Sequence, residues 1–550
     1  MKLTAYCAVV GAAMLGAQAA VTCYPDRWVH VRNDLMTDGK LKHFEDVVAR
    51  GAACGFNGIL FDVGIGGEGV DADGWSGKRL KRLEVARDFC REAGMEIVPM
   101  LWSVGRANAF VRSDPTLAEG QPVKSVPYMA AVGCAEFDAS GAETMRGIFG
   151  GTAVIDAMGT RSKAVSLKVK PYRRYRVTAR VVRYGFRNWS GAGANKVPVR
   201  TSFVFSAQPV KNGKGRNARE NFLGRIFEDG AQNVMFEFLS TDAEEERISV
   251  GVNYRADAGR LEFADVDVVE VGLRRPVVRQ GCTFSVRNAA TGKEYVAGKD
   301  FILPASDASP CAEGDVDVAI ALPPGSAIKP GTALLVDAYE PSRRNAEQVS
   351  ACMANPGLYE YFDRTAPVID RLFGHPKKWF LSMDEIRAGG SCGACKSSGM
   401  DMAHLLAQCL ARQRDSIRKV RPDAIIYAWC DMYDPCVNAI PLKSGYAMCD
   451  GDYAHSGFLA PKDIVAVVWG GEKSAPKSLE HFVSNGVPTL YATYYDVFSA
   501  ENSRIRDAAA IANGAPGCRG LVYTTWIEGG RYDMLEKFGE VMKTESKPRR

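Results

Sequence analysis

Residues 378–385 are Lys-Trp-Phe-Leu-Ser-Met-Asp-Glu, a short apolar run that ends in two adjacent carboxylates. A run of this length between helical stretches is typical of a strand buried on both faces of a parallel sheet. Leu358–Phe373 before it and Met402–Val420 after it have helical periodicity, and Arg421-Pro422 closes the second helix. The stretch therefore predicts a helix–strand–helix unit whose strand has a polar end.

The same unit recurs along the chain, because other apolar runs alternate with amphipathic helical stretches in the same way. This alternation is typical of parallel strands covered by helices, and eight strands in this order favour a closed barrel over an open doubly wound sheet. No early strand opens a helix with a Gly-x-Gly-x-x-Gly fingerprint. We therefore expect an α/β fold, a (β/α)8 TIM barrel. The predicted strands are 28–32, 58–62, 96–102, 378–383, 424–429, 464–469, 489–493 and 520–525.

The alternation is interrupted after the third strand. From about residue 106 to 345 the sequence has short period-two β segments with frequent Gly and Pro, such as Val165–Val169 and Tyr175–Val182. We expect a large jelly-roll-like β-sandwich insertion over 106–275, similar to a carbohydrate-binding module, and a small β-rich segment over 276–345. An insertion that only supports the barrel mouth is the alternative. The catalytic barrel would then comprise 24–105 and 346–550.

The first residues have the pattern of an export signal. Lys2 is followed by the apolar run Tyr6–Leu15, too short to span a bilayer, and by the small-residue cleavage pattern Ala17-Gln18-Ala19. We expect a signal peptide over 1–20 and a secreted or periplasmic protein, with a buried N-terminal helix as the alternative. The net charge of +5 gives no reason to expect nucleic acid or an anionic membrane as partner, and no later segment has the pattern of a membrane span.

The 15 cysteines are scattered, and only the pair Cys392 and Cys395 has a recognisable spacing. Without a second pair at zinc-ribbon spacing, no complete four-ligand zinc site is visible. We therefore predict no metal and no cofactor. A local disulfide and two unpaired thiols are both open for Cys392 and Cys395.

Carboxylates and tryptophans recur at the ends of the predicted strands, where barrel enzymes build their active sites. Aromatic rings stack on the apolar faces of sugar rings, and carboxylates accept hydrogen bonds from hydroxyl groups. The combination favours a glycan substrate. The residues at or just beyond the strand ends are Arg32, Asp62, Trp102, Asp384, Glu385, Trp429, Asp431, Trp469, Tyr494, Asp496, Trp526 and Glu528.

The adjacent pair Asp384 and Glu385 is the sharpest feature of this set. A glycosidase needs an acid for the leaving oxygen and a second group at the anomeric carbon. Neighbours on one strand diverge, so they are poorly placed to hold opposite faces of a sugar. A 2-acetamido sugar removes this difficulty, because its own carbonyl oxygen attacks the anomeric carbon while the second carboxylate orients the amide N–H.

Over about residues 27–105 and 350–543 the chain resembles the family 20 glycoside hydrolases, the β-N-acetylhexosaminidases. That family has Asp-Glu after strand four, Tyr-x-Asp after strand seven and Trp-x-Glu after strand eight. The usual His-x-Gly-Gly before Asp-Glu is replaced by Phe380–Met383, and the family's preceding α/β domain is absent. A sister family with the same Asp-Glu pair is therefore the alternative. The matching residues are Asp384, Glu385, Tyr494, Asp496, Trp526 and Glu528, with Trp429, Trp469 and Arg32 ending strands five, six and one.

The resemblance implies an exported glycoside hydrolase that removes β-linked N-acetylhexosamine by substrate-assisted, retaining catalysis. Glu385 would be the general acid and base, kept protonated by burial beside Asp384. Asp384 would orient the acetamido group, and Tyr494 would donate a hydrogen bond to its oxygen. Trp429, Trp469 and Trp526 would wall the pocket, and Arg32, Asp496 and Glu528 would bind ring hydroxyls.

Two other functions remain open. One is a retaining β-glycosidase acting on galactosides or glucosides, with Glu385 as acid and Glu528 as nucleophile. The other is a glycan-binding protein without catalysis. A serine or cysteine hydrolase has little support, because the sequence contains no Gly-x-Ser-x-Gly elbow.

Overall fold

The computed structural model describes most of the chain. The predicted signal peptide lies outside the described residues. Among the described helices, none is long and apolar enough to cross a membrane. The described residues are 24–62, 77–156, 159–190, 197–198, 203–211, 214–215, 220–224, 226, 228–252, 255–306, 316–341, 343–344, 348–440, 449, 451–469, 474–495, 511–512, 515, 517–526, 530 and 532–545.

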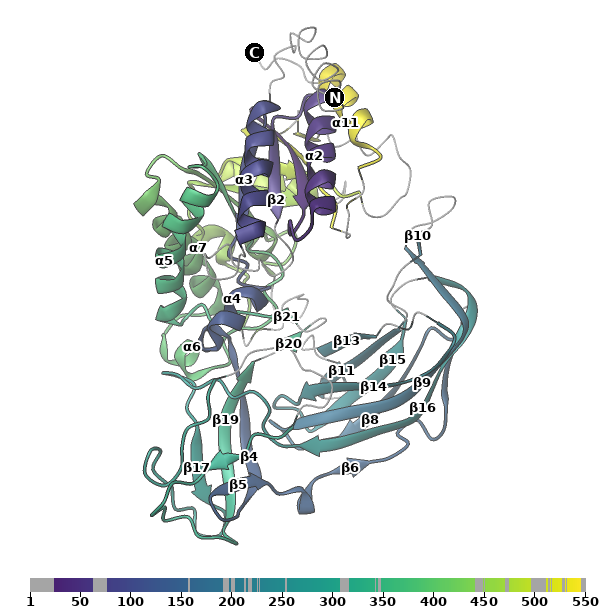
Figure 1. The fold of residues 1–550 in the computed structure, drawn as a ribbon, viewed down its shortest axis with the longest axis vertical. Helices are drawn as coiled ribbons and strands as arrows, with labels where there is room; N and C mark the ends of the chain where they lie inside the picture. Colours follow the sequence, from purple (N-terminus) through teal and green to yellow (C-terminus); the bar gives the residue numbers. More distant parts are fainter. Residues whose placement is uncertain are drawn as a thin grey trace.

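Eight parallel strands close into a barrel, which confirms the predicted (β/α)8 TIM-barrel architecture (Figure 1). The strands are almost completely buried, because side chains fill the barrel on one face and helices cover the other. Trp28, Phe380, Tyr427 and Trp429 are among the large residues of the interior cluster. The strands, in barrel order, are β1 (Asp26–Arg32), β2 (Gly58–Asp62), β3 (Glu96–Leu101), β22 (Lys378–Leu381), β23 (Ile425–Trp429), β24 (Ile464–Trp469), β25 (Thr489–Ala492) and β26 (Cys518–Tyr523).

Three helices of the barrel, α2, α5 and α7, begin where a side chain caps the first turn. Thr37 accepts a hydrogen bond from Lys40 N, and Asp401 accepts one from His404 N. Asn355 caps the helix that begins at Pro356. Proline has no N–H group, and at this first helical position the missing N–H costs nothing. The helices between or after barrel strands are α2 (Asp38–Ala53), α3 (Gly77–Glu92), α5 (Pro356–Leu372), α7 (Met402–Val420), α8 (Ser456–Leu459), α9 (Ala475–Ser484) and α11 (Leu535–Glu545).

Between β3 and β22 the chain builds three sheets of antiparallel strands (Figure 1). A six-stranded and a five-stranded sheet contribute to one apolar cluster, which includes Phe203, Phe205, Phe236 and Phe263. The six-stranded sheet contains β6 (Thr144–Met145), β7 (Ala153–Asp156), β9 (Arg174–Ser190), β10 (Val197–Pro198), β14 (Gly230–Leu239) and β16 (Arg255–Val271). The five-stranded sheet contains β8 (Ser162–Lys168), β11 (Phe203–Lys211), β12 (Lys214–Gly215), β13 (Glu220–Gly224) and β15 (Glu245–Gly251).

The third sheet is built from both ends of the insertion, in the order β17-β19-β4-β5-β18. The predicted division at residue 275 follows chain order, whereas β4 and β5 pair with strands that come about 200 residues later. Such long-range antiparallel pairing leaves no local sequence pattern. The strands are β4 (Gly120–Ala130), β5 (Cys134–Phe137), β17 (Ser285–Asn288), β18 (Ile320–Ala321) and β19 (Ala333–Pro341). A short pair, β20 (Arg343–Arg344) and β21 (Gln348–Val349), leads back toward the barrel.

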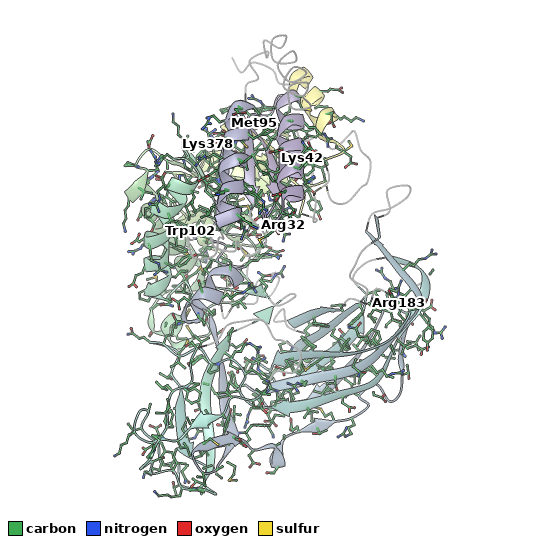
Figure 2. All side chains as sticks on the ribbon, in the orientation of Figure 1. Arg32, Lys42, Met95, Trp102, Arg183 and Lys378 are labelled. Atoms are coloured by element: carbon green, nitrogen blue, oxygen red, sulfur yellow. The ribbon has the colours of Figure 1, made fainter. Side chains whose placement is uncertain are left out.

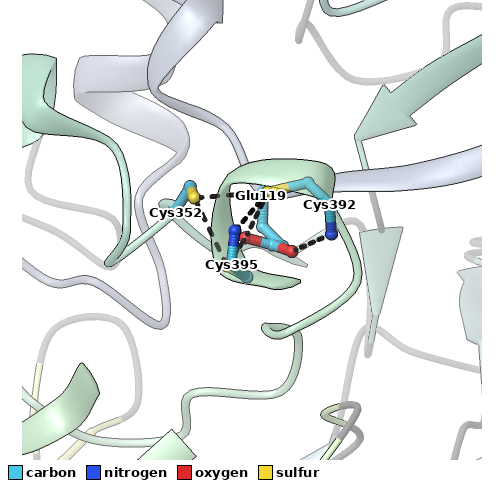
Figure 3. Close-up of side chains that lie close together, drawn as sticks. All are labelled: Glu119, Cys352, Cys392 and Cys395. Atoms are coloured by element: carbon cyan, nitrogen blue, oxygen red, sulfur yellow. Dashed lines mark hydrogen bonds between the residues drawn. The ribbon is translucent and has the colours of Figure 1, made fainter. Parts of the chain in front are cut away.

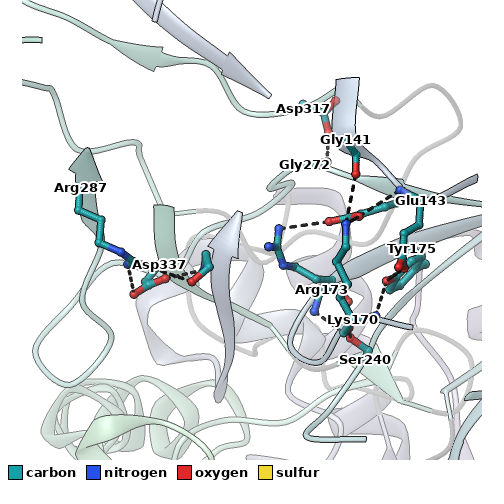
Figure 4. Close-up of polar contacts among 12 residues, drawn as sticks. Gly141, Glu143, Lys170, Arg173, Tyr175, Ser240, Gly272, Arg287, Asp317 and Asp337 are labelled. Carbon is teal, nitrogen blue, oxygen red and sulfur yellow. Dashed lines mark hydrogen bonds and ion pairs between the residues drawn. The ribbon is translucent and has the colours of Figure 1, made fainter. Parts of the chain in front are cut away.

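Buried ion pairs join the third sheet to the six-stranded sheet. Arg174 on β9 donates from Nε to Glu340 Oε2 on β19 at 2.6 Å. Burial alone disfavours an ionised Glu340, but the charge of Arg174 and the backbone N–H groups of Arg274 and Arg275 hold its pKa below the usual range. Nearby, Lys170 binds Glu270 and Tyr175 donates to Glu143 (Figure 4). The pair of Arg174 and Glu340 therefore links the two parts of the insertion, whereas the contacts of Lys170 and Tyr175 lie within one part.

The two ends of the barrel face different surroundings. Figure 2 labels Arg32 and Trp102 at the carboxyl ends of β1 and β3, on the side of the insertion. Met95 and Lys378, at the amino ends of β3 and β22, lie at the opposite end. The rim that holds the predicted site residues therefore lies toward the inserted sheets.

Candidate active site

Glu385 follows β22 in a backbone conformation that glutamate rarely adopts. Its φ is 49°, in the left-handed region, which costs energy unless neighbouring contacts hold it. Gln348 Nε2 supplies such contacts by donating to Glu385 O at 2.6 Å and to Gly105 O at 2.7 Å. A Cβ on Gly105 would lie 2.3 Å from Asp384 O, so only glycine fits there. The two chain segments that border the insertion thus hold the Asp384–Glu385 backbone in place.

Two arginines contact the Glu385 carboxylate. Arg106 pairs with Oε2 from the segment after β3, and Arg387 Nη2 lies 3.0 Å from Oε1. The side chains of Glu385 and Arg106 are each 23% exposed, so water screens these pairs only in part. Two guanidinium groups stabilise the ionised carboxylate. This environment is the opposite of the one expected from the sequence, where burial beside Asp384 would keep Glu385 protonated.

A second pair of carboxyl groups, Asp384 and Asp431, lies beside Glu385. Ser382 Oγ donates to Asp384 Oδ1 at 2.8 Å. Asp431 is fully buried and accepts hydrogen bonds from Asn438 Nδ2 at 2.9 Å, from Glu385 N at 3.4 Å and from Trp469. Burial, and after it the negative charge of Asp384, raise the pKa of Asp431 to about 8. Asp431 therefore holds a proton at neutral pH.

An aromatic group connects the ends of β1, β23 and β26. The rings of Trp429 and Trp526 have centroids 5.6 Å apart, and Trp526 lies 4.6 Å from the ring of His30. Arg32 Nη1 donates to Trp526 O at 3.1 Å, and its Nε lies 3.9 Å from Asp62 Oδ2. Arg32, Trp429 and Trp526 are thus brought together as the sequence predicts for one rim. Trp429 is only 1% exposed and belongs to the barrel interior.

The remaining predicted site residues differ in exposure. Trp469 at the end of β24 is 40% exposed, and Tyr494 after β25 is 47% exposed. The neighbouring Tyr495 instead packs inward, stacked on Tyr523 with ring centroids 4.3 Å apart. Both exposed rings are therefore accessible to a ligand at the rim. Asp496 and Glu528 lie outside the described residues.

Four polar residues of this site were not assigned from the sequence: Arg106, Arg387, Gln348 and Asn438. Arg387 has a usable signal, because it stands two residues after Glu385. Arg106 and Gln348 lie on either side of the insertion. The sequence indicates only that both are near the barrel rim, because the insertion must begin and end there. Asp431 was noted at a strand end, but its partners Asn438 and Trp469 give no pattern that local spacing reveals.

For the pair Cys392 and Cys395, the structure shows the second of the two alternatives that the sequence leaves open. Neither cysteine is in a disulfide. Among the described residues they form, with Glu119 and Cys352, a buried group of four side chains at metal-ligand spacing. Glu119 and Cys352 are distant in the sequence, which is why the spacing of one Cys-x-x-Cys pair did not reveal the group.

No family model matches the chain, and no curated protein matches it. Solved structures similar to it include a β-N-acetylhexosaminidase (9% identity, TM-score 0.39, 96% of this chain and 73% of that one) and a glycoside hydrolase family 20 β-N-acetylglucosaminidase (8%, 0.37, 95% and 70%). A rhamnosidase from Novosphingobium sp. PP1Y is also similar (10%, 0.35, 96% of this chain), and the chain spans 60% of that enzyme's length. Two of these are of the kind that the Asp-Glu, Tyr-x-Asp and Trp-x-Glu patterns resemble. At such low identity and TM-score, these similarities do not define the activity of this chain.

Proposed function

We propose that this chain is a glycoside hydrolase that releases β-linked N-acetylhexosamine from glycans with retention of configuration. The observation that carries the proposal is the position of Asp384 and Glu385 directly after the fourth strand of a closed eight-stranded barrel. This is the carboxyl-terminal rim, where barrel enzymes assemble their catalytic groups. Trp469, Tyr494 and the half-buried Trp526 supply aromatic surface at the same rim.

In the first step, Glu385 gives its proton to the glycosidic oxygen as the bond from that oxygen to the anomeric carbon breaks. The carbonyl oxygen of the substrate's 2-acetamido group forms the new bond to the anomeric carbon, which gives a cyclic oxazolinium. Asp384 accepts a hydrogen bond from the amide N–H and stabilises the positive charge of the ring. Tyr494 donates its hydroxyl to the acetamido oxygen.

In the second step, Glu385 accepts a proton from water, whose oxygen attacks the anomeric carbon and opens the oxazolinium ring. Two inversions at one carbon retain the original configuration. Asp431, protonated at neutral pH, adds no negative charge of its own to the site.

The arginine contacts of Glu385 impose a condition on this mechanism. An ionised Glu385 cannot protonate the leaving oxygen, so the substrate must displace Arg106 or Arg387 from the carboxylate when it binds. Arg106 is the more easily displaced partner, since its side chain is 23% exposed against 11% for Arg387.

The inserted sheets lie on the side of this rim. In the proposed function they would hold the glycan as a carbohydrate-binding β-sandwich.

The experiment compares p-nitrophenyl β-GlcNAc and β-GalNAc with the β-galactoside and β-glucoside, with and without a thiazoline mimic of the oxazoline. Release from the acetamido sugars alone, blocked by the thiazoline and lost in Glu385→Gln, is the expected result. Release from the plain sugars without thiazoline inhibition would overturn the substrate-assisted mechanism. It would favour a conventional retaining β-glycosidase with Glu528 as nucleophile.

A glycan-binding protein without turnover is the second candidate, and the paired arginines on Glu385 favour it. A carboxylate held by two guanidinium groups is a stable arrangement that needs no catalysis. In that case the unmodified protein retains glycans on an affinity column, releases no sugar from any of the four substrates, and binds equally well as Glu385→Gln.

A further inference from the structure

A buried cluster of thiols and one carboxylate lies where the insertion joins the barrel. Glu119 precedes β4, Cys352 follows β21, and Cys392 and Cys395 lie in and next to the short helix α6 (Gly393–Ser397) after β22. All four side chains are buried, and their donor atoms lie within 4.8 Å of one another (Figure 3). Three chain segments that are far apart in sequence thus meet at one point.

The sulfur positions are those of metal ligands rather than of a disulfide. Cys352 Sγ is 3.6 Å from Cys392 Sγ and also 3.6 Å from Cys395 Sγ. A disulfide would bring one pair to about 2.05 Å and leave the third sulfur apart. Tetrahedral zinc with Zn–S bonds of about 2.3 Å separates its sulfurs by about 3.8 Å. Two Sγ–Sγ distances of 3.6 Å, with all donor atoms within 4.8 Å of one another, therefore fit three sulfurs around a common centre.

Glu119 completes the cluster on its open side. Its Oε2 is 3.3 Å from Cys395 Sγ and 3.8 Å from Cys392 Sγ. Its other oxygen accepts hydrogen bonds from the backbone N–H groups of Ser391 and Cys392, at 2.9 and 3.1 Å. One oxygen is thus held by the loop while the other lies among the sulfurs, an arrangement that fixes a ligand's orientation.

A further thiol and an arginine surround this group. Cys282 hydrogen-bonds to Cys392, and Arg279 Nη2 lies 3.7 Å from Cys392 Sγ. Gly393 N donates to Gly281 O at 2.8 Å, which holds the turn of Cys282 against the Cys392–Cys395 turn. A Cβ on Gly281 would lie 2.4 Å from Ala394 N, so the two turns approach as closely as glycine allows. Arg279 would offset part of the negative charge that three thiolates and a carboxylate bring.

We propose that Cys352, Cys392, Cys395 and Glu119 bind one structural zinc ion that ties the insertion to the loop after Glu385. Three soft thiolates and a buried carboxylate are a donor set that zinc accepts in tetrahedral geometry, and the closed shell leaves no open position for catalysis. The ion holds together the segment that leaves the barrel, the segment that returns and the loop that begins at Arg387. This site is independent of the proposed hydrolase activity.

The test measures metal in the full chain, purified without chelators under reducing conditions. We expect about one zinc per chain by mass spectrometry, and less than about a tenth of that in Cys352→Ser, Cys392→Ser or Cys395→Ser. Glu119→Gln should weaken zinc binding at least about tenfold in a chelator competition, because a ligand is lost. Cys282→Ser and the control Cys134→Ser, which lies on β5 outside the cluster, should keep full zinc content.

Cobalt exchange provides a second readout that does not depend on the variants folding. Cobalt bound in the unmodified chain should give thiolate-to-cobalt charge-transfer bands and the visible bands of a tetrahedral site. An absence of metal after reconstitution, or a disulfide within the cluster by peptide mapping, would overturn the proposal. Loss of zinc in Cys282→Ser with normal binding in Glu119→Gln would overturn the assignment of Glu119 as the fourth ligand.

Discussion

The two ends of the barrel use similar residues for different purposes. At the amino end, the fully buried carboxylate of Asp26 is bound by Lys378 at 2.6 Å, Arg519 at 2.6 Å and Tyr427 at 2.7 Å. At the carboxyl end, Glu385 is partly exposed, has a left-handed backbone and is paired with the partly exposed Arg106 and the buried Arg387. The first carboxylate is saturated with partners, whereas the second keeps an exposed face.

This difference explains which charges stabilise the fold and which are available for chemistry. Asp26 joins the starts of β1, β22 and β26, so its partners are fixed as soon as the barrel closes. Glu385 lies after a strand end, and its partners come from segments beside the insertion. A ligand at the rim can compete with Arg106 for Glu385, whereas the Asp26 carboxyl is fully buried and closed to a ligand. The predictions below separate these two kinds of carboxylate.

The largest expected effect is on turnover at the carboxyl end. Glu385→Gln removes the proposed proton donor, so kcat/KM for β-GlcNAc substrates should fall by about 10²–10⁴-fold. Tm should change little, because Glu385 is not part of the buried core. The matched control is Glu45→Gln, whose side chain is similarly exposed at 21% and lies on helix α2 rather than at a strand end. A fall in activity that tracks a fall in Tm would contradict the assignment.

The next effect is on stability at the amino end. Asp26→Ala leaves Lys378 and Arg519 without their shared partner and should lower the free energy of unfolding by about 3 kcal/mol, the lower end of the range for a broken buried ion pair. The lower end applies because Lys378 keeps Glu96 at 2.6 Å and Arg519 is 27% exposed. Denaturant unfolding measures the change.

The control for the amino end is Asp46→Asn, which breaks an exposed pair with Lys42 on α2 and should cost less than about 1 kcal/mol. The folded fraction of the Asp26→Ala variant should have the same kcat as the unmodified chain. A loss of kcat without a loss of stability would mean that the amino end contributes to catalysis.

The sequence predicts features that depend on local patterns, but not contacts between segments far apart in the chain. All eight barrel strands were predicted, because each is a continuous apolar run between helical patterns, and such runs are local. The positions of Asp384, Glu385 and Trp469 at strand ends followed from the same runs. The partners of Glu385 did not, because Arg106 and Gln348 stand about 280 and 40 residues away across the insertion. The cluster of Cys352, Cys392, Cys395 and Glu119 was missed for the same reason.

A smaller effect concerns the pH dependence of turnover. If Glu385 acts as the acid, Arg106→Gln removes a positive charge that favours its ionised form, and the basic limb of the kcat/KM profile should move up by about one pH unit. Arg112→Gln, on the exposed side of α4 (Asn108–Ser113), is the control and should leave the limb in place. An unmoved limb in Arg106→Gln would mean that another group sets the alkaline loss of activity.

The last comparison separates Asp431 from both Asp26 and Glu385, because Asp431 is a buried carboxyl to which no cationic side chain of the described residues bonds. The folded chain keeps the Asp431 proton up to about pH 8, whereas the unfolded chain releases it near about pH 3.9. The folded state therefore binds more protons between these values, and this group lowers the free energy of unfolding as pH rises. Asp431→Asn removes that dependence, so the Tm of the variant relative to the unmodified chain should rise steadily between pH 5 and 8. Asp46→Asn should show no such trend, and a variant curve parallel to that of the unmodified chain would mean that Asp431 is already ionised in the folded protein.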